Sequence, residues 1–161
     1  IQELIKQTAD EGDSLGGIIS CKVSNCQSGL GEPVFDKLNA ELAKAIFSIN
    51  AVKGIEFGSG FKSSKHKGSE NNDAPNRSMN NDGGITAGIS NGKDILFNTA
   101  FKPVSSIAKE QMAMNTNGEI IPLQIKCRHD PCVLPRAVPI VEAMTALVIC
   151  DHLLLNLKYK K

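Results

Sequence analysis

The sequence is poor in aromatic residues: tryptophan is absent, tyrosine occurs once, and aromatic side chains make up 4% of the 161 residues. Proteins that hold single-stranded nucleic acids stack bases on aromatic side chains, so such a site is not expected. An excess of charge of one sign is missing as well, because 18 Lys+Arg stand against 17 Asp+Glu for a formal net charge of +1. Without an overall basic field, we predict no nucleic-acid partner.

Long hydrophobic runs are also lacking, since none approaches the roughly 20 uninterrupted apolar residues of a membrane helix. The longest apolar segment, 143–155, is interrupted by Thr145, Asp151 and His152. The first eleven residues carry four charged side chains and do not look like a signal peptide. We therefore predict a soluble, cytoplasmic protein with no membrane partner. Because the chain begins at Ile1 and not at a methionine, we expect a truncated or processed product.

The cysteines do not form a recognisable disulfide or zinc pattern. Their number is odd and no CxxC occurs, because four residues separate the members of each close pair. The three histidines are scattered, without the spacing of a ligand pair. We expect no metal site, and we expect free thiols in a reducing cytosol. The cysteines are Cys21, Cys26, Cys127, Cys132 and Cys150.

Apolar side chains recur at helical spacing in two longer segments. Residues 34–49 predict an amphipathic helix with Asp36 in its first turn, where a carboxylate favours the helix dipole. Segment 138–156 is apolar around most of its circumference, which predicts a central, buried helix. Pro139 would lie in its first turn, and Glu142 close enough to the N-terminus to complement the dipole. A short helix is expected before Gly12.

The remaining segments predict strands and loops. Residues 62–84 are polar, and a loop this long is usually functional or disordered. Grouped antiparallel strands separated by two or three helices favour a layered α+β fold over a repeated βαβ fold, and no GxGxxG pattern indicates a dinucleotide site. The length fits a single domain, residues 1–161. Strands are expected over 18–23, 52–57 and 94–101, with a hairpin over 107–114 and 119–125.

Three clusters of side chains could carry chemistry. Segment 102–106 places a lysine beside two serines after a strand, which could hold a phosphate or an anionic ring system, although turns favour the same residue types. Segment 128–136 contains two arginines, a histidine and an aspartate, and an Asp–Arg ion pair is the structural alternative to a binding loop. At 50–54, small side chains leave room for a ligand, although Asn50 could instead cap the preceding helix. The lysines of 62–67 could attract an anion.

Several motifs follow the order in which they occur in the chorismate synthase family. Residues 128–144 begin Arg-His-Asp-Pro-Cys, continue through Pro-Arg-Ala-Val-Pro to Glu-Ala-Met, and resemble the C-terminal signature of that family. Residues 13–17, Asp-Ser-Leu-Gly-Gly, resemble its DSxGG segment. The family's N-terminal half carries a Gly-Glu-Ser-His-Gly type motif and a Ser-Ala-Arg motif, which do not occur here, so the chain resembles the C-terminal half only. Further matching segments are 29–38, 51–58, 68–70, 88–92 and 102–106.

The resemblance implies a reaction, a cofactor and an assembly. Members of the family are lyases of the shikimate pathway to aromatic amino acids. They convert 5-enolpyruvylshikimate 3-phosphate to chorismate by anti-1,4-elimination of phosphate and require reduced FMN. The implied fold is an α+β sandwich in which antiparallel sheets flank central helices, and the implied assembly is a homotetramer. We expect the isolated chain to be inactive, because the family's acid–base histidines lie in the other half.

The resemblance also assigns roles to individual residues. Asp130 matches an aspartate proposed to act as a base near the flavin ring, and Arg128 matches an arginine that touches flavin or substrate. Two positions depart from the family. Ala87 stands where glycine is usual, so its methyl could crowd a backbone contact, and Val104 replaces a common threonine, which removes a hydroxyl. The implied FMN-contact positions are Asn50, Ala51, Ala87, Lys102, Pro103, Val104, Ser105, Ser106 and Arg128.

Two other functions remain open at this point. One is a non-catalytic assembly or ligand-binding domain of the same fold, against which the intact clusters at 102–106 and 128–130 argue. The other is an enzyme of unrelated chemistry that uses Cys132 as a nucleophile near His129, although no adjacent motif orders such a pair.

Overall fold

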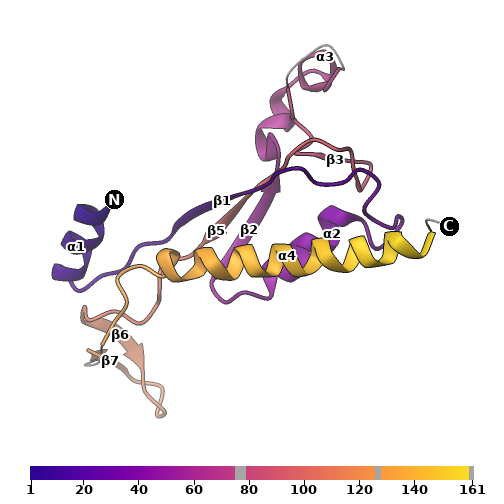
Figure 1. The fold of residues 1–161 in the computed structure, drawn as a ribbon. Helices are drawn as coiled ribbons and strands as arrows, with labels where there is room; N and C mark the ends of the chain where they lie inside the picture. Colours follow the sequence, from indigo (N-terminus) through magenta and orange to yellow (C-terminus); the bar gives the residue numbers. More distant parts are fainter. Residues whose placement is uncertain (75–78, 126–127, 160–161) are drawn as a thin grey trace.

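The computed structural model describes residues 1–74, 79–125 and 128–159, and it has the expected α+β organisation (Figure 1). The first helix, the three predicted strands and the hairpin are confirmed, with ends that differ by a few residues. In chain order the elements are α1 (Gln2–Asp10), β1 (Gly17–Val23), α2 (Leu38–Phe47), β2 (Val52–Phe57), the 3₁₀ helix η1 (Gly60–Lys65), α3 (Gly68–Asn71), β3 (Ile85–Thr86), β4 (Ile89–Ser90), β5 (Ile95–Phe101), β6 (Gln111–Met114), β7 (Ile120–Leu123) and α4 (Leu134–Tyr159).

Strand β5 is the centre of a three-stranded antiparallel sheet with the order β1-β5-β2. Because successive side chains of a strand point to opposite faces, its buried residues mark the face that carries the core. Helix α2 contacts β2, α4 contacts β1, and the two helices pack on each other, so both cover this face (Figure 1). The buried residues of β5 are Ile95, Phe97, Thr99 and Phe101.

Helix α2 is shorter than the sequence predicts. It begins at Leu38, because residues 32–36 close a loop through two backbone hydrogen bonds between Glu32 and Asp36, at 2.8 and 3.0 Å. Asp36 therefore precedes the helix, and the prediction that it lies in the first turn is wrong. The amphipathic pattern itself is confirmed, since the buried residues recur every four positions and face the core. They are Leu38, Leu42 and Ile46.

Helix α4 starts four residues before the predicted helix and continues past its expected end. The backbone N–H groups of Arg136 and Ala137 donate to the carbonyl of Val133, which supports this early start. Pro139 therefore lies inside the helix and not in its first turn, and it cannot donate a helical hydrogen bond. Glu142 lies beyond the first turn, so its expected interaction with the helix dipole is also wrong.

Only one stripe of α4 faces the core. Ala137, Val141, Thr145 and His152 are buried, whereas the residues of the outer face are 41–64% exposed. The prediction of a helix buried on most of its circumference is therefore wrong for this chain, because none of the described residues covers that face (Figure 1). By length and composition alone this helix is long and apolar enough to cross a membrane, a test that the core helix of a soluble protein also passes. The exposed apolar residues are Val138, Ile140, Leu147, Leu154 and Leu157.

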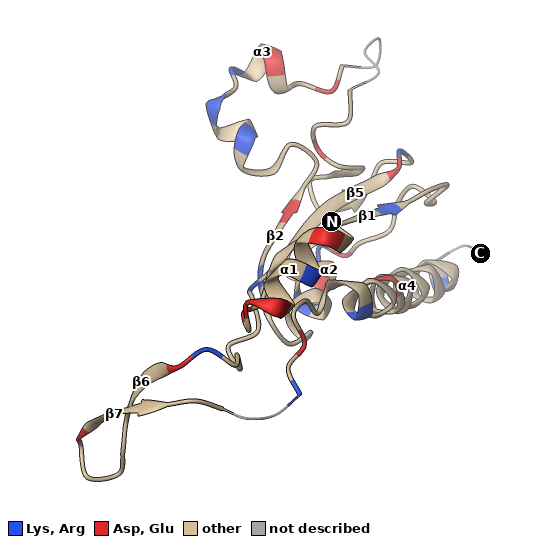
Figure 2. Cartoon of the chain, turned by 90° about the vertical axis from the view of Figure 1, so that its left-hand side faces the viewer, with Lys and Arg blue, Asp and Glu red and all other residues tan. Residues whose placement is uncertain are grey.

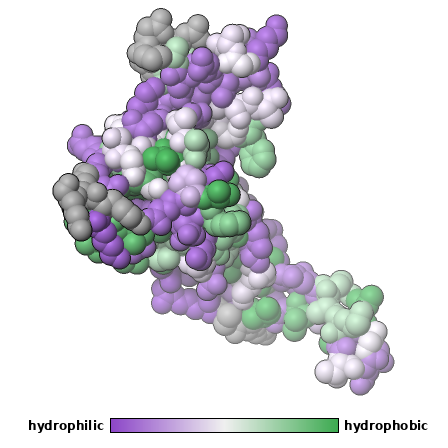
Figure 3. Space-filling view, turned by 90° about the vertical axis from the view of Figure 1, so that its right-hand side faces the viewer, coloured by the Kyte–Doolittle hydropathy of each residue, from purple (hydrophilic) through white to green (hydrophobic). Residues whose placement is uncertain are grey.

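Strands β6 and β7 form the predicted hairpin, which extends away from the body of the molecule (Figure 2). Each strand has four residues and is shorter than predicted. An isolated two-stranded hairpin is marginally stable in water, and this one exposes apolar side chains that form a green protrusion in Figure 3. The hairpin thus lacks a packing surface within the described chain. Its exposed apolar residues are Met112, Met114, Ile120, Ile121 and Leu123.

The polar segment 62–84 contains local order. It includes most of η1 and all of α3, and the Asp73 carboxylate accepts hydrogen bonds from the backbone N–H groups of Asn81 and Asp82, both at 2.9 Å. Desolvation raises the pKa of Asp73, but the bonds from Asp82 and Asn81 outweigh it, so the pKa lies below its ordinary value of 3.8. Residues 75–78 lie outside the described residues. The described part is therefore a loop closed by its own carboxylate.

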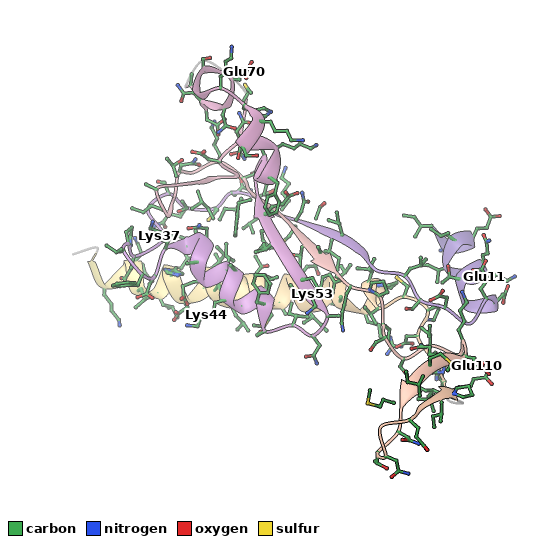
Figure 4. The ribbon with its side chains drawn as sticks, turned by 180° about the vertical axis from the view of Figure 1, so that it is seen from behind. Glu11, Lys37, Lys44, Lys53, Glu70 and Glu110 are labelled. Atoms are coloured by element: carbon green, nitrogen blue, oxygen red, sulfur yellow. The ribbon has the colours of Figure 1, made fainter. Side chains whose placement is uncertain are left out.

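Truncation of Leu42 tests the core face of α2. Because Leu42 is fully buried, Leu42→Ala should lower the free energy of unfolding by about 2–5 kcal/mol. Lys44→Ala is the control on the same helix, since the Lys44 side chain is 77% exposed (Figure 4) and its loss should change stability by less than about 0.5 kcal/mol. Urea unfolding followed by circular dichroism measures both. Equal effects of the two variants would contradict this assignment of the buried face.

Candidate functional site

A cavity of about 730 Å³ lies where the end of β5 meets the turn between α2 and β2 and the start of α4. Its volume is in the range of small-molecule and cofactor sites. Part of the wall is apolar and comes from Ile49, Val133 and Ile140. The remaining wall contains six of the residues to which the resemblance assigns flavin contacts: Asn50, Ala51, Lys102, Pro103, Val104 and Ser105.

The register between β2 and β5 brings the two main segments of this cavity together. Val52 lies opposite Phe101 in the sheet. The next residues outward, Ala51 and Lys102, are joined by a hydrogen bond of 2.9 Å from the Lys102 N–H to the Ala51 carbonyl. Ala51 has a φ of 71°, a left-handed conformation that few non-glycine residues adopt. Such strain concentrates at ligand-binding sites, which agrees with a role for this turn.

Asn50 lies in the cavity wall and not at the helix end. Helix α2 ends at Phe47, and Ser48 is its cap residue, so the alternative that Asn50 caps this helix is wrong. Its amide side chain offers both a donor and an acceptor to a ligand in the cavity. Asn50 thus remains a candidate ligand contact.

Arg128, Asp130 and Arg136 line a second cavity of about 390 Å³. Arg136 lines both cavities, and its guanidinium donates a hydrogen bond to Oδ1 of Asp130. The ion pair considered as a structural alternative is therefore present, but both side chains remain accessible, at 68% and 33% exposure. The two cavities together are lined by three cationic side chains, Lys102, Arg128 and Arg136, and by one carboxylate, Asp130. This excess of positive charge favours an anionic ligand.

Arg136 belongs to the predicted cluster 128–136, but the resemblance to the family assigns it no role. It lies in the first turn of α4, where the helix dipole disfavours a cation. This unfavourable position is a sequence signal for a binding role, because a cation in the first turn is stabilised by a nearby carboxylate or anionic ligand and not by its own helix. Only the fold shows that its guanidinium reaches Asp130 and that Arg136 also lines the larger cavity.

Ser106 and His129 connect the two segments that carry the predicted site residues. The Oγ atom of Ser106 lies 3.3 Å from Nδ1 of His129, and Nε2 of His129 lies 3.0 Å from the carbonyl oxygen of Ile125. Ser106 is not among the described residues that line the larger cavity. Its contact nevertheless ties the end of segment 102–106 to the loop that carries Arg128 and Asp130.

The Asp-Ser-Leu-Gly-Gly segment lies between the same two parts of the chain. The hydroxyl of Ser14 donates to the carbonyl of Val104 at 2.6 Å, and the N–H of Leu15 donates to the carbonyl of Pro131 at 2.7 Å. Gly16 has no room for a side chain, because a Cβ there would collide with the backbone at the end of β5. Residues 13–17 therefore connect the two candidate loops, 102–106 and 128–136, through hydrogen bonds to both.

Asp13 connects residues 13–17 to Lys109, which follows segment 102–106 in the chain. Its Oδ2 accepts a hydrogen bond of 2.7 Å from Nζ of Lys109, and its Oδ1 accepts one of 2.8 Å from the N–H of Ser14. The bond from Lys109, followed by that from Ser14, lowers the pKa of Asp13 below its ordinary 3.8. The same pair raises the pKa of Lys109 above 10.5.

Ala87 is not brought to either cavity. It lies in the turn between β3 and β4, which Figure 1 shows on the side of α3 and far from the hairpin β6–β7. Ala87 and Gly88 have φ values of 54° and 89°, so this turn requires two left-handed residues. A glycine, usual here in the family, suits that backbone, and an alanine costs roughly 1–2 kcal/mol. The alanine at position 87, where the family usually has glycine, therefore affects the conformation of this turn and neither of the two cavities.

The four described cysteines are unpaired, and Cys127 lies outside the described residues. Burial raises the pKa of the Cys21 and Cys26 thiols, which disfavours their reactive thiolates. Cys132 is partly buried, and its backbone forms an isolated bridge with Leu15. Within the described parts of the chain, no group of three or more His, Cys, Asp or Glu could hold a metal ion. The absence of a metal site stays a prediction.

Comparisons with known proteins agree in pointing to one family. A family model described as chorismate synthase matches residues 1–154. The chorismate synthase of Prochlorococcus marinus (strain MIT 9215) is 56% identical over 163 residues, which cover 96% of this chain and 45% of that protein. The chorismate synthase of Christiangramia forsetii is 53% identical over 160 residues, covering 97% and 45%. The chain thus spans less than half the length of these relatives.

A solved structure supports the same relationship at the level of the fold. A crystal structure of chorismate synthase superposes with a TM-score of 0.77 and 28% sequence identity. The match covers 96% of this chain and 42% of that chain. The α+β architecture is therefore similar to about two fifths of a larger known fold.

The Asp13–Lys109 pair predicts a pH dependence. Because the folded-state pKa of Asp13 is lowered, its contribution to stability is present above pH 3.8 and is lost as the pH falls through the lowered pKa. Lys109→Met should return the pKa of Asp13 toward its ordinary value, whereas Lys65→Met, on η1, should not change it. Carboxyl chemical shifts followed by NMR across the acid range measure this. An unchanged Asp13 titration in Lys109→Met would contradict the pairing.

Proposed function

Since the chain belongs to the chorismate synthase family, we propose that it forms the C-terminal, flavin-contacting half of a chorismate synthase. The complete enzyme is a lyase that converts 5-enolpyruvylshikimate 3-phosphate to chorismate by anti-1,4-elimination of phosphate. The observation that carries the proposal is the meeting of 50–51, 102–105 and the Arg128–Asp130–Arg136 cluster around two adjoining cavities. Substrate and cofactor are both anionic, and cations with oriented donors suit them.

The residues of the larger cavity fit reduced FMN. Lys102 supplies a cation, Ser105 a hydroxyl, and Asn50 an amide that can donate or accept, while Ile49 and Ile140 supply apolar wall for a ring system. Reduced FMN held by these residues would supply transient electron donation to the elimination, with no net redox change. The chain's own groups orient this cofactor and compensate its phosphate charge. Ser14 donates its hydrogen bond to the backbone carbonyl of Val104. The replacement of the family's threonine by valine at this position therefore leaves that contact unchanged.

Asp130 is the group that we assign to proton transfer. Its Oδ1 accepts from Arg136, so Oδ2 is the oxygen left to take a proton from a bound ligand. Arg136 holds the carboxylate in one orientation, and Arg128 on the same cavity binds an anionic group of substrate or flavin. Positioning of the base by an ion pair is therefore part of the proposed mechanism.

The rest of the enzyme explains the exposed apolar surfaces. We place the missing half of the sandwich over the outer face of α4, where five large apolar side chains lie exposed. Burial of that face would complete a layered fold with a central helix. The complete protein is proposed to be a cytoplasmic homotetramer without nucleic-acid or membrane partners. The unpaired state of the described cysteines supports a reducing compartment.

A second candidate is a non-catalytic assembly or ligand-binding domain of the same fold. The strained alanine at position 87 is the observation that favours it, because the family's usual glycine fits that turn better. The charged cluster around Arg136 argues for the enzyme instead, since an assembly domain has no need for an accessible Asp–Arg pair beside a cavity.

The proposal predicts activity only with both halves present. In a complete enzyme, made by joining this chain to the N-terminal half of the Christiangramia forsetii relative, reduced FMN and substrate should give chorismate. The isolated 161-residue chain should be at least about 10²-fold slower, because it lacks the acid–base histidines. Chorismate formation is measured by absorbance. Failure of the complete protein to bind FMN would favour the non-catalytic assembly domain. Comparable turnover by the isolated chain would contradict the prediction that catalysis requires both halves.

Replacing Asp130 tests the assigned base. In the complete enzyme, Asp130→Asn should lower kcat by about 10²–10⁴-fold, since the amide cannot take the proton. Asp151→Asn is the matched control, because Asp151 is exposed on α4 and contacts neither cavity. Steady-state kinetics at saturating FMN measure both. A kcat loss below threefold in Asp130→Asn would remove Asp130 from the mechanism.

A further inference from the structure

The hairpin β6–β7 has one face that consists of apolar side chains alone. Residues directly opposite each other in an antiparallel pair point to the same face, and neighbours along a strand point to opposite faces. The large side chains of this face are 66–72% exposed, against 41–45% for the large apolar side chains of the opposite face. We call it the apolar hairpin face, and the register assigns to it Met112, Met114, Ile120 and Pro122.

The hairpin lies in the chain between the two segments that carry the candidate site, 102–106 and 128–136. Its base is fixed by two hydrogen bonds of 2.9 Å. The N–H of Ala108 donates to the carbonyl of Gly12, and the side-chain amide of Gln124 donates to the carbonyl of Ala108. Beyond this base the hairpin extends away from the body (Figure 2). Whatever holds the hairpin therefore also restrains the chain that leads into and out of both candidate loops.

The N-terminus of the chain lies at the same end of the molecule as the hairpin. Figures 1 and 4 show α1 and β6–β7 at that end from opposite sides. The residues after α1 reach the hairpin base through Gly12 and through the 2.7 Å contact between Asp13 and Lys109. In the complete enzyme proposed above, the N-terminal half joins the chain at Ile1, which is 98% exposed. That half therefore enters beside the hairpin.

We propose that the apolar hairpin face docks on the N-terminal half of the complete enzyme and thereby fixes both candidate loops. This inference rests on the proposed function and concerns a surface separate from the outer face of α4. More than half of the length of each relative lies outside the match, so there is enough chain to form the docking surface. Removal of apolar side chains from water favours such a contact, and the partner surface must be apolar as well.

A second copy of this chain suits the face less well. A stable interface between two proteins buries about 800 Å² and roughly 20–30 residues on each side, whereas the apolar hairpin face offers four side chains. A half that is covalently joined needs less area, because the linkage makes the contact intramolecular and raises its effective concentration. The face carries no charge that would attract a nucleic acid or a charged peptide.

The same charge placed on the two faces of β6 tests the docking. In the complete enzyme, Met112→Glu should weaken FMN binding about tenfold or more, because a carboxylate is costly in an apolar contact and the undocked hairpin loosens both loops. Gln111→Glu is the matched control at the neighbouring position on the other face. It should stay within about threefold of the unmodified enzyme, as should Met112→Leu, which remains apolar. Titration calorimetry with FMN measures all four proteins.

Hydrogen exchange of the unmodified proteins reports on the docking without any substitution. The amides of 111–114 and 120–123 should exchange at least about tenfold more slowly in the complete enzyme than in the isolated chain, because an isolated hairpin opens readily. Equal exchange in the two proteins would overturn the proposal. Protection that disappears when the complete enzyme is diluted until its subunits separate would also overturn it, since a second copy would then cover the face.

FMN binding separates this proposal from the proposed function. If the complete protein binds no FMN, the proposed function fails, and slow exchange of the hairpin amides still supports the docking. If FMN binds, and Met112→Glu binds it as tightly as Gln111→Glu, the proposal is overturned while the proposed function stands.

Discussion

The pairing of β5 between β1 and β2 is the constraint on which the rest of this structure depends. One face of β5 carries the core side chains that α2 and α4 cover. The strand then runs directly into segment 102–106, so the register that places Val52 opposite Phe101 also joins Ala51 to Lys102. A register slip of one residue would turn Phe101 to the other face and separate the two walls of the larger cavity. Core and candidate site therefore share one hydrogen-bond ladder.

The apolar surfaces of the chain have one physical explanation. Helix α4 is apolar around most of its circumference, but the sheet and α2 bury only one stripe, and the hairpin β6–β7 has no packing partner among the described residues. A core face of this size without a second layer is unfavourable in water. The relatives are more than twice as long as this chain, which is the observation behind the proposal that their other half supplies such a layer.

Local patterns predicted most of the elements. Helical spacing identified the buried face of α2, and the segments expected to form strands include β1, β2 and β5. The start of α2 was missed because the backbone bonds between Glu32 and Asp36 leave no trace in hydrophobic periodicity. The burial of α4 was misjudged for a different reason. A helix that is apolar on all sides can be buried on all sides. Whether it is buried depends on a second layer of protein that covers the side facing away from the sheet.

The candidate site was predictable as a set of segments and not as a geometry. The order of motifs indicated the family, and segments 50–51, 102–105 and 128–130 do meet around adjoining cavities. The contacts of Arg136 and His129, and the separate position of Ala87, required the fold.

The sequence by itself determined the local elements, the near-neutral charge and the family to which the chain belongs. The tertiary structure alone decided which side chains meet, as in the bond from Ser14 to Val104, whose residues are 90 positions apart. The physical reason is that periodicity and turn chemistry act over a few residues, whereas such contacts depend on strand register and helix placement across the whole core.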